Sequence, residues 1–182
     1  EGPNAATSSA SIFAAMDAAL EAGKFKSDFS IGNVDAALKD ARKVIGHAYR
    51  VPYLAHATME TMNCTAHFDN GKLTIWGGFQ DGLGARAKAA KFAGIPIDDV
   101  TLNHTAMGGG FGRRGSTLNY LQHAIGVARQ VQGPVQLVFT REEDMTQDYY
   151  RHASVSRMKA ALDDKGKVTA WLHQFTEKFD PP

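Results

Sequence analysis

Residues 107–115 read Met107-Gly-Gly-Gly-Phe-Gly-Arg-Arg-Gly115 and form the most informative segment of the chain. An apolar strand pattern precedes this segment at residues 100–106, and a helical pattern follows it from Ser116 to about Gln132. Four glycines in the five positions 108–112 disfavour helix and strand, because each glycine loses extra backbone entropy on ordering. The glycine-rich segment (residues 107–115) is therefore predicted to be a loop whose backbone N–H groups can approach a ligand.

Three interpretations of this segment stay open. In the first, the loop and the helix start at Ser116 cradle an anion, and Arg113 and Arg114 add charge-assisted hydrogen bonds to a phosphate. In the second, the segment is a flexible surface turn with two solvated arginines. In the third, it is a dinucleotide fingerprint, because residues 110–115 match G-x-G-x-x-G. The acidic residue of such a fingerprint would be Glu142, which lies 27 positions after residue 115 rather than the usual spacing of about 20.

The rest of the chain predicts alternating helices and strands. The strongest local signal is a hairpin of residues 64–68 and 73–78, because Asn70-Gly71 tolerates the positive φ angles of a tight turn. Periodicity and end signals predict helices at residues 12–20, 34–42, 85–93 and 141–148, and further strands at 44–51, 135–140, 153–162 and 167–179. We expect an α+β fold with a mixed sheet. Residues 1–182 are expected to form a single piece, with a helical lead-in (1–42) and a mixed-sheet core (43–179).

Composition excludes several classes of protein. Lys and Arg number 20 and Asp and Glu 19, so a net charge of +1 is too balanced for a nucleic-acid binder that works through bulk charge. One cysteine, Cys64, excludes an internal disulfide framework and a Cys-rich zinc or iron–sulfur site in this chain. No apolar run approaches the roughly 20 residues of a spanning helix. The chain begins without methionine and ends in Pro-Pro, so we expect a fragment of a longer protein.

Three segments in order resemble one protein family. Residues 49–60 contain His56-x-x-x-Glu60, residues 75–80 are a strand pattern ending in Gln80, and residues 107–112 read Met-Gly-Gly-Gly-Phe-Gly. Together they resemble the large, molybdenum-carrying subunit of the xanthine dehydrogenase/aldehyde oxidase family. Residues 56–66, taken with Gly-Phe-Gly-Arg-Arg, resemble most the isoquinoline 1-oxidoreductase β-subunit branch. The resemblance runs from about Val34 to Phe175.

This resemblance implies a molybdopterin-binding domain and a redox function. The implied reaction is oxidation of an aldehyde or an N-heteroaromatic carbon, with water as the oxygen source. The implied cofactor is molybdenum on molybdopterin in its cytosine dinucleotide form, which carries the difficult chemistry. Electrons would leave through iron–sulfur clusters on a small partner subunit, and the rest of the large subunit would be a further partner. Neither nucleic acid nor a membrane span is expected, and the compartment is left open, with the periplasm favoured over the cytoplasm.

The resemblance also assigns residues. Gln80 is the expected catalytic residue, because its carboxamide would donate a hydrogen bond to an oxygen ligand of molybdenum without adding charge. No metal ligand is expected from the chain, since the dithiolene supplies the sulfur, and His56 with Glu60 is interpreted as a supporting or packing pair. The expected cofactor-binding residues share the glycine-rich segment: Gly108, Gly109, Gly110, Phe111, Gly112 and Arg113.

Two departures from the family pattern limit these expectations. Gly115 stands where xanthine-specific members carry a glutamate, which favours an aldehyde or a simpler heterocycle over a purine. The glutamate base of the family lies beyond Pro182, so the chain alone is expected to be inactive. The competing hypothesis is a non-catalytic anion- or nucleotide-binding module, or an NAD-binding domain, that uses the same segment.

Overall fold

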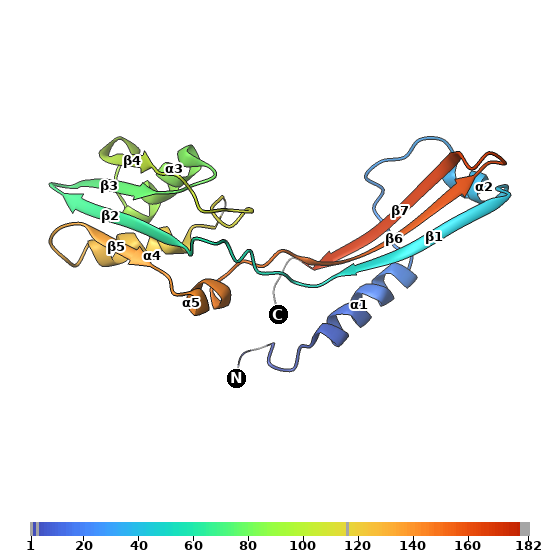
Figure 1. Cartoon of the computed structure of the whole chain (residues 1–182), viewed down its shortest axis with the longest axis horizontal. Coiled ribbons are helices and arrows are strands. Elements are labelled where there is room, and N and C mark those ends of the chain that lie inside the picture. Colours follow the sequence, from blue (N-terminus) through green and yellow to red (C-terminus); the bar gives the residue numbers. More distant parts are fainter. Residues whose placement is uncertain (1, 3, 116, 179–182) are drawn as a thin grey trace. The chain divides into compact units, whose positions relative to one another are not determined.

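The computed structural model describes residues 2, 4–115 and 117–178, which form two compact units (Figure 1). Unit 1 comprises residues up to 54 and from 151 onward, and unit 2 comprises residues 55–150. Each unit has its own sheet, with strand orders β1-β6-β7 and β4-β3-β2-β5. The expected single mixed-sheet core over residues 43–179 differs from this arrangement. Local periodicity predicts which segments are strands, but it does not predict which strands pair.

Unit 1 packs helices on an antiparallel sheet. Its elements are α1 (Ser9–Glu21), α2 (Val34–Lys39), β1 (Lys43–Val51), β6 (Ala153–Leu162) and β7 (Val168–Lys178). A capping box at Ser8 begins α1, and the Asn33 side chain accepts a hydrogen bond from the Ala36 N–H at the start of α2. The apolar face of α1 (Ile12, Met16, Leu20) is buried against β6. This core holds the helix on the sheet.

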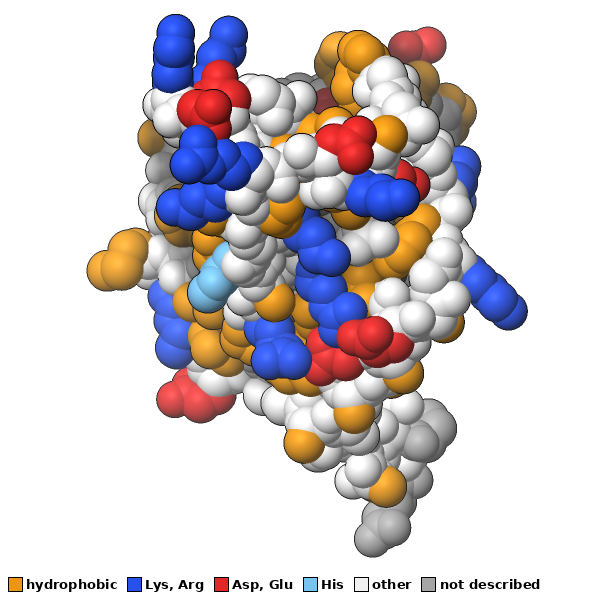
Figure 2. Space-filling view, turned by 90° about the vertical axis from the view of Figure 1, so that its right-hand side faces the viewer, with side chains coloured by type: hydrophobic (Ala, Val, Ile, Leu, Met, Phe, Trp, Pro, Cys, Tyr) orange, Lys and Arg blue, Asp and Glu red, His pale blue; other side chains and the backbone are white. Residues whose placement is uncertain are grey.

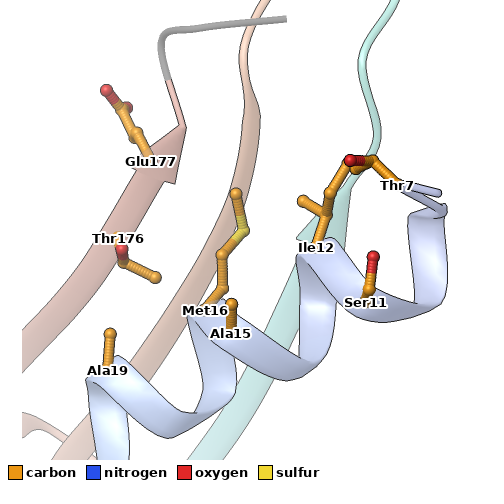
Figure 3. A pocket seen from close by; sticks show the side chains of 8 residues that line it. All are labelled: Thr7, Ser11, Ile12, Ala15, Met16, Ala19, Thr176 and Glu177. Atoms are coloured by element: carbon orange, nitrogen blue, oxygen red, sulfur yellow. The ribbon is translucent and has the colours of Figure 1, made fainter. Parts of the chain in front are cut away.

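A hollow on the surface of unit 1 lies beside α1. Residues of α1 line it together with Thr176 and Glu177 of β7, and small or apolar side chains such as Ala15 and Ala19 point toward it (Figure 3). Figure 2 shows that acidic and basic side chains alternate with hydrophobic ones over one face of the molecule. No residue of the glycine-rich segment lines the hollow.

Among the described residues, no helix has the length and apolar character that crossing a membrane requires.

Unit 2 contains the mixed sheet. Its elements are β2 (Asn63–Asp69), β3 (Lys72–Gly77), α3 (Gly82–Ala93), the 3₁₀ turn η1 (Ile97–Asp99), β4 (Val100–His104), α4 (Asn119–Ala128), β5 (Val135–Val138) and α5 (Arg141–Thr146). β3 and β4 are parallel and are joined through α3, while β2 pairs antiparallel with β3 and β5. The turn between β2 and β3 has φ of 48° at Asn70 and 80° at Gly71, which confirms the predicted hairpin. The mixed α+β fold class is likewise confirmed.

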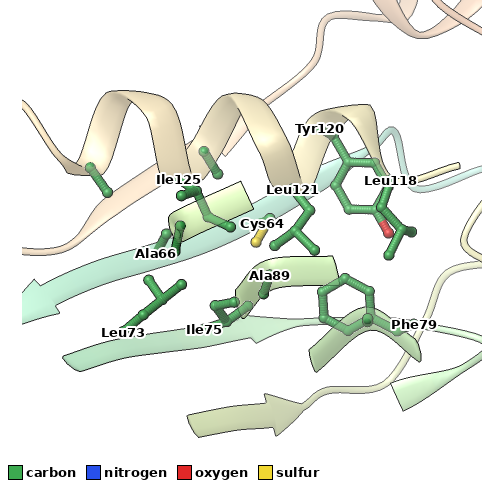
Figure 4. Close-up of a cluster of buried hydrophobic side chains, with 14 of the residues drawn as sticks. Cys64, Ala66, Leu73, Ile75, Phe79, Ala89, Leu118, Tyr120, Leu121 and Ile125 are labelled. Atoms are coloured by element: carbon green, nitrogen blue, oxygen red, sulfur yellow. The ribbon is translucent and has the colours of Figure 1, made fainter. Parts of the chain in front are cut away.

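The core of unit 2 lies between its sheet and α4 (Figure 4). Cys64, Leu73 and Ile75 from the sheet face apolar side chains of α4. Burial raises the pKa of the Cys64 thiol to about 12. The rings of Phe79 and Tyr120 stack with centroids 6.2 Å apart. Phe79 lies just after β3 and directly before Gln80, and Tyr120 lies in the first turn of α4, shortly after the glycine-rich segment. The stacked rings therefore hold these two parts of the chain together.

α4 is shorter than the sequence predicts. It begins at Asn119 and ends at Ala128, whereas the expected helix ran from Ser116 to about Gln132. Ser116, the expected N-cap, lies outside the described residues. Leu118 occupies the N-cap position and makes no side-chain capping bond. The glycine-rich segment is therefore not followed directly by a helix N-terminus.

Candidate functional site

Gln80 lies against the glycine-rich segment. Its backbone N–H donates to the Arg114 carbonyl at 3.0 Å, and its Oε1 accepts from the N–H groups of Gly112 (2.9 Å) and Arg114 (3.2 Å). Because two backbone donors point at this atom, it is the amide oxygen and the Nε2 group faces elsewhere. Gln80 is exposed, and Nε2 donates to none of the described residues. The carboxamide is thus held in place with its donor side open.

Three successive backbone N–H groups of the segment have no hydrogen-bond partner in the described part of the chain. Residues 109–111 donate no backbone hydrogen bond to any residue that the structure describes. The backbone φ is positive at Gly109 (102°), Phe111 (55°) and Gly112 (106°). Successive N–H groups in such turns form concave sites that bind anions or strongly polar oxygens. These amides directly precede Gly112, whose N–H holds the Gln80 carboxamide.

Phe111 carries backbone strain at the centre of the segment. A bulky residue at positive φ is uncommon, and it costs of the order of 1–3 kcal/mol unless the surroundings impose it. The ring gains little in return from burial, because 76% of the residue is exposed. Strain of this kind concentrates at functional sites. The outlier therefore supports a binding role for this segment.

The Arg114 side chain ties the glycine-rich segment to residues 60 and 61. Its side chain is fully buried and donates to the carbonyl oxygens of Gly109 (2.9 Å), Glu60 (3.0 Å) and Thr61 (3.2 Å). It also forms an ion pair of 3.0 Å with Glu60 Oε2. The same carboxylate oxygen accepts from the Gly108 N–H at 2.7 Å. Glu60 and Arg114 together therefore fix the conformation of the loop.

Arg113 is also buried, which corrects the expectation for both arginines. Its guanidinium donates to Thr117 O (2.9 Å) and Asn119 Oδ1 (2.8 Å), and its Nε lies 3.0 Å from Asp148 Oδ1. A buried charge must be paired, and here the protein itself supplies the partners. The side chains of Arg113 and Arg114 therefore face inward, where a phosphate does not reach them. The segment is not a turn with solvated arginines, and a cation already occupies the start of α4.

The glycines at positions 108 and 110 allow close contacts within the protein. A Cβ on Gly108 would lie 2.5 Å from the Glu60 Cβ. A Cβ on Gly110 would lie 2.6 Å from Gln80 Oε1 and 2.8 Å from its Cδ. A Cβ essentially never lies this close to a non-bonded atom, so any larger residue at either position would force Glu60 or Gln80 to move. Sequence reasoning expected these glycines to admit a ligand, and it missed this internal requirement.

The dinucleotide interpretation does not match the sheet. A nucleotide-binding fold continues its strands in parallel with helical crossovers. Here β4, the strand before the segment, is an edge strand, and the only parallel pair in unit 2 among the described residues is β3 with β4. Glu142, the expected acidic partner, lies on α5 rather than at a strand end. These observations disfavour an NAD-binding domain.

Comparison with known proteins assigns the family. A family model described as the molybdopterin cofactor-binding domain matches residues 18–179. The chain belongs to this family. Among the described residues of this molybdopterin cofactor-binding domain, no three His, Cys, Asp or Glu side chains gather as a metal site would require. The glycine-rich segment and Gln80 present amide donors, which suit the oxygen atoms of an organic group.

Individual relatives are similar over most of this chain. The aldehyde oxidoreductase molybdenum-binding subunit PaoC of Escherichia coli O157:H7 is 29% identical over 147 residues, which are 81% of this chain and 20% of the relative. The membrane-bound aldehyde dehydrogenase [pyrroloquinoline-quinone] of Gluconacetobacter polyoxogenes is 33% identical over 149 residues, 80% of this chain and 19% of the relative. The structure of quinoline 2-oxidoreductase from Pseudomonas putida 86 aligns with a TM-score of 0.72 at 20% identity, covering 88% of this chain and 22% of that one.

The comparisons support the predicted family but do not test the predicted branch within it. The predicted family is confirmed, and its homologues include molybdenum-dependent oxidoreductases. The isoquinoline 1-oxidoreductase branch stays a prediction. The molybdopterin cofactor-binding domain described here spans about one fifth of the length of the curated relatives that it matches first.

Glu60 predicts how this domain responds to acid. Burial raises the pKa of Glu60, but hydrogen bonds from Gly108 and Asn63 and the charge of Arg114 together lower it below the usual 4.5. A carboxylate with a lowered pKa adds stability above its unfolded-state pKa, and this stability is lost as pH falls through the folded-state pKa. We therefore expect Glu60→Gln to be less stable than the unchanged protein at pH 7. The difference should shrink below about pH 4.5.

Urea unfolding followed at several pH values between 3 and 7 measures this difference. The expected result is two curves of free energy of unfolding against pH that converge on the acid side. Curves that stay parallel over the whole range would show that the Glu60 charge does not stabilise the loop.

Proposed function

We propose that this chain holds the molybdopterin cofactor of a molybdenum hydroxylase large subunit between Gln80 and the glycine-rich segment. The complete subunit would oxidise an aldehyde or N-heteroaromatic substrate with water as the oxygen source. The observation that carries this proposal is the Gln80 carboxamide, whose oxygen accepts from two loop amides while its Nε2 stays exposed and open. The family match supports the cofactor class.

Residues 109–111 and Gln80 have the hydrogen-bond donors that molybdopterin would require. The unpaired N–H groups of residues 109–111 would bind oxygen atoms of the cofactor, and Nε2 of Gln80 would donate to an oxygen near the metal. Molybdenum bound by the pterin supplies the two-electron oxidation. A fixed, neutral donor stabilises developing negative charge without reorganisation, which is the main contribution that a protein makes around such a cofactor.

Finer assignments extend the proposal. Hydroxylation of a C–H group with an oxygen atom from water releases two electrons and two protons, and we assign the electron exit to iron–sulfur clusters on a small partner subunit. The cytosine dinucleotide form of the cofactor and the isoquinoline 1-oxidoreductase branch belong to the proposal as well. Relatives named for aldehyde and quinoline oxidation support these two substrate classes. Alone, the chain is proposed to be inactive, because the family's glutamate base lies outside it.

Replacing Gln80 by alanine in the full-length subunit, produced with its partner, tests the proposal. Loss of one preorganised donor is expected to lower kcat by about 10²–10³-fold while the molybdenum content per chain stays near that of the unchanged enzyme. Gln132→Ala, at an exposed position in the turn after α4, is the matched control and should leave kcat unchanged. Metal analysis and steady-state kinetics give both quantities.

Two outcomes would overturn the proposal. Unchanged kcat in Gln80→Ala would remove Gln80 from the site. A full-length protein that binds nucleotide but contains no molybdenum would instead favour the non-catalytic module.

A further inference from the structure

His56 is held at two points by a single carboxylate. Its backbone N–H donates to Asp148 Oδ2 at 2.6 Å, and its ring Nδ1 lies 2.9 Å from Asp148 Oδ1. The Asp148 side chain is only 2% exposed, and Arg113 Nε contacts the same Oδ1 at 3.0 Å. The three side chains therefore form a connected series from the buried Arg113 to the ring of His56. Backbone and ring of His56 are both fixed.

The partners of Asp148 determine the tautomer of the ring. This carboxylate accepts from the backbone N–H groups of His56 and Tyr149 (2.7 Å) and faces the Arg113 guanidinium. The Asp148 carboxylate can only accept hydrogen bonds, so the ring nitrogen Nδ1 that contacts it must carry a hydrogen and donate it. In the neutral imidazole, Nε2 then carries a lone pair. His56 therefore presents a hydrogen-bond acceptor on the side of the ring away from Asp148.

This acceptor faces the glycine-rich segment. Nε2 lies 3.6 Å from the position that a Cβ on Gly112 would occupy, and no described residue forms a hydrogen bond with Nε2. The His56 side chain is 15% exposed, so that a ligand resting on the exposed Gly112 can reach it. The unpaired amides of residues 109–111 and Nε2 of Gln80 all donate. Nε2 of His56 supplies a side-chain acceptor that complements these donors.

We propose that His56 is a cofactor-binding residue whose Nε2 accepts a hydrogen bond from a ring N–H or amino group of the bound pterin. Asp148 is the positioning residue, since it acts through His56 by fixing the tautomer and the ring orientation. The inference rests on the proposed function, because it requires that the glycine-rich segment holds molybdopterin. It adds a rule of selection: a heterocycle that presents an acceptor at this edge meets the lone pair of Nε2 and is rejected.

A pair of amide substitutions separates the two ring nitrogens. In His56→Asn the new amide takes the place of Nδ1 and can still donate to Asp148, but the shorter side chain has no atom in the place of Nε2 to accept from the ligand. In His56→Gln the amide takes the place of Nε2 and can again accept from the ligand. In the full-length subunit with its partner, we expect His56→Asn to release pterin about tenfold faster than the unchanged protein, in line with loss of one hydrogen bond. His56→Gln should retain pterin better than His56→Asn.

Pterin fluorescence after oxidative release, and molybdenum per chain, measure retention without reference to turnover. Thermal unfolding of the cofactor-free proteins shows whether the substitutions act on folding instead, and equal melting temperatures are expected. Asp148→Asn is the second variant. With its oxygen kept at the Oδ1 position, where Arg113, Tyr149 and Nδ1 converge, its NH2 group opposes the His56 backbone N–H at the Oδ2 position. The substitution is therefore expected to loosen the hold on His56 and to lower retention.

The outcomes distinguish this inference from the proposed function. Retention in His56→Asn equal to that of the unchanged protein, or equal losses in His56→Asn and His56→Gln, would overturn the role of His56 while the effect of Gln80→Ala on kcat still stood. An unchanged full-length protein without pterin would overturn both.

Discussion

Arg114→Met is expected to lower the free energy of unfolding of unit 2 by about 3 kcal/mol or more. Arg114 is fully buried, and its side chain donates to three carbonyl oxygens and pairs with Glu60. Methionine fills similar space but removes the donor to the Gly109 carbonyl oxygen, and an unmade buried bond costs about 1–3 kcal/mol. The Glu60 and Thr61 carbonyl oxygens keep hydrogen bonds from Thr58 and Asn63, so the larger part of the loss comes from breaking the ion pair with Glu60. Glu60 keeps 37% of its side chain exposed and can regain water, which keeps the expected loss near the lower end of the range for buried pairs.

Urea unfolding at pH 7 measures this loss. Arg42→Met is the matched control, because the Arg42–Asp164 pair is 79% and 72% exposed and such pairs contribute about 1 kcal/mol at most. An effect of Arg114→Met no larger than that of the control would mean that the carbonyl oxygens around Arg114 are satisfied by water. Arg114 would then not be what shapes the loop.

Gly110→Ala is expected to reduce turnover of the full-length enzyme about as much as Gln80→Ala, by roughly 10²-fold or more. The new Cβ would lie 2.6 Å from Gln80 Oε1 and 2.8 Å from its Cδ, so the carboxamide has to leave its place beside the loop. Gly110 is not among the residues with positive φ, so alanine introduces no backbone strain of its own. The effect is therefore predicted to come from the displaced carboxamide.

A double-mutant cycle tests this explanation. In a Gln80→Ala background the obstructing side chain is gone, so Gly110→Ala should add little further loss, and the two effects should be strongly non-additive. Gly126→Ala is the matched control: its Cβ meets nothing within 4 Å, it lies in α4, and it should raise stability by about 0.5–1 kcal/mol without changing turnover. Additive effects of the first two substitutions would show that Gly110 acts independently of Gln80.

Local signals predicted the elements of this fold well. The Asn70-Gly71 turn acts within a few residues, so its consequence can be read from neighbouring positions. The separation into two units was not predictable in this way. β1 pairs with β6 across about a hundred residues, and no local pattern records that pairing.

The candidate site was predicted in part. The family resemblance placed Gln80 with the glycine-rich segment, and the structure brings them into hydrogen-bond contact, while their role toward the cofactor stays a prediction. The burial of Arg113 and Arg114 was missed, because two adjacent arginines in a loop are usually solvated. The contact of His56 with Asp148 was missed too, since 92 positions separate these residues and neither belongs to a recognisable pair.

Cys64 has a consequence for experiments on this chain. Its thiol is enclosed between the four-stranded sheet and α4, burial raises its pKa to about 12, and it is the chain's one cysteine. Thiol reagents attack the thiolate of an accessible cysteine, so alkylation at neutral pH has to wait until the surrounding side chains part. The alkylation rate of the unmodified chain thus serves as a gauge of how often unit 2 opens, and no label has to be engineered into it.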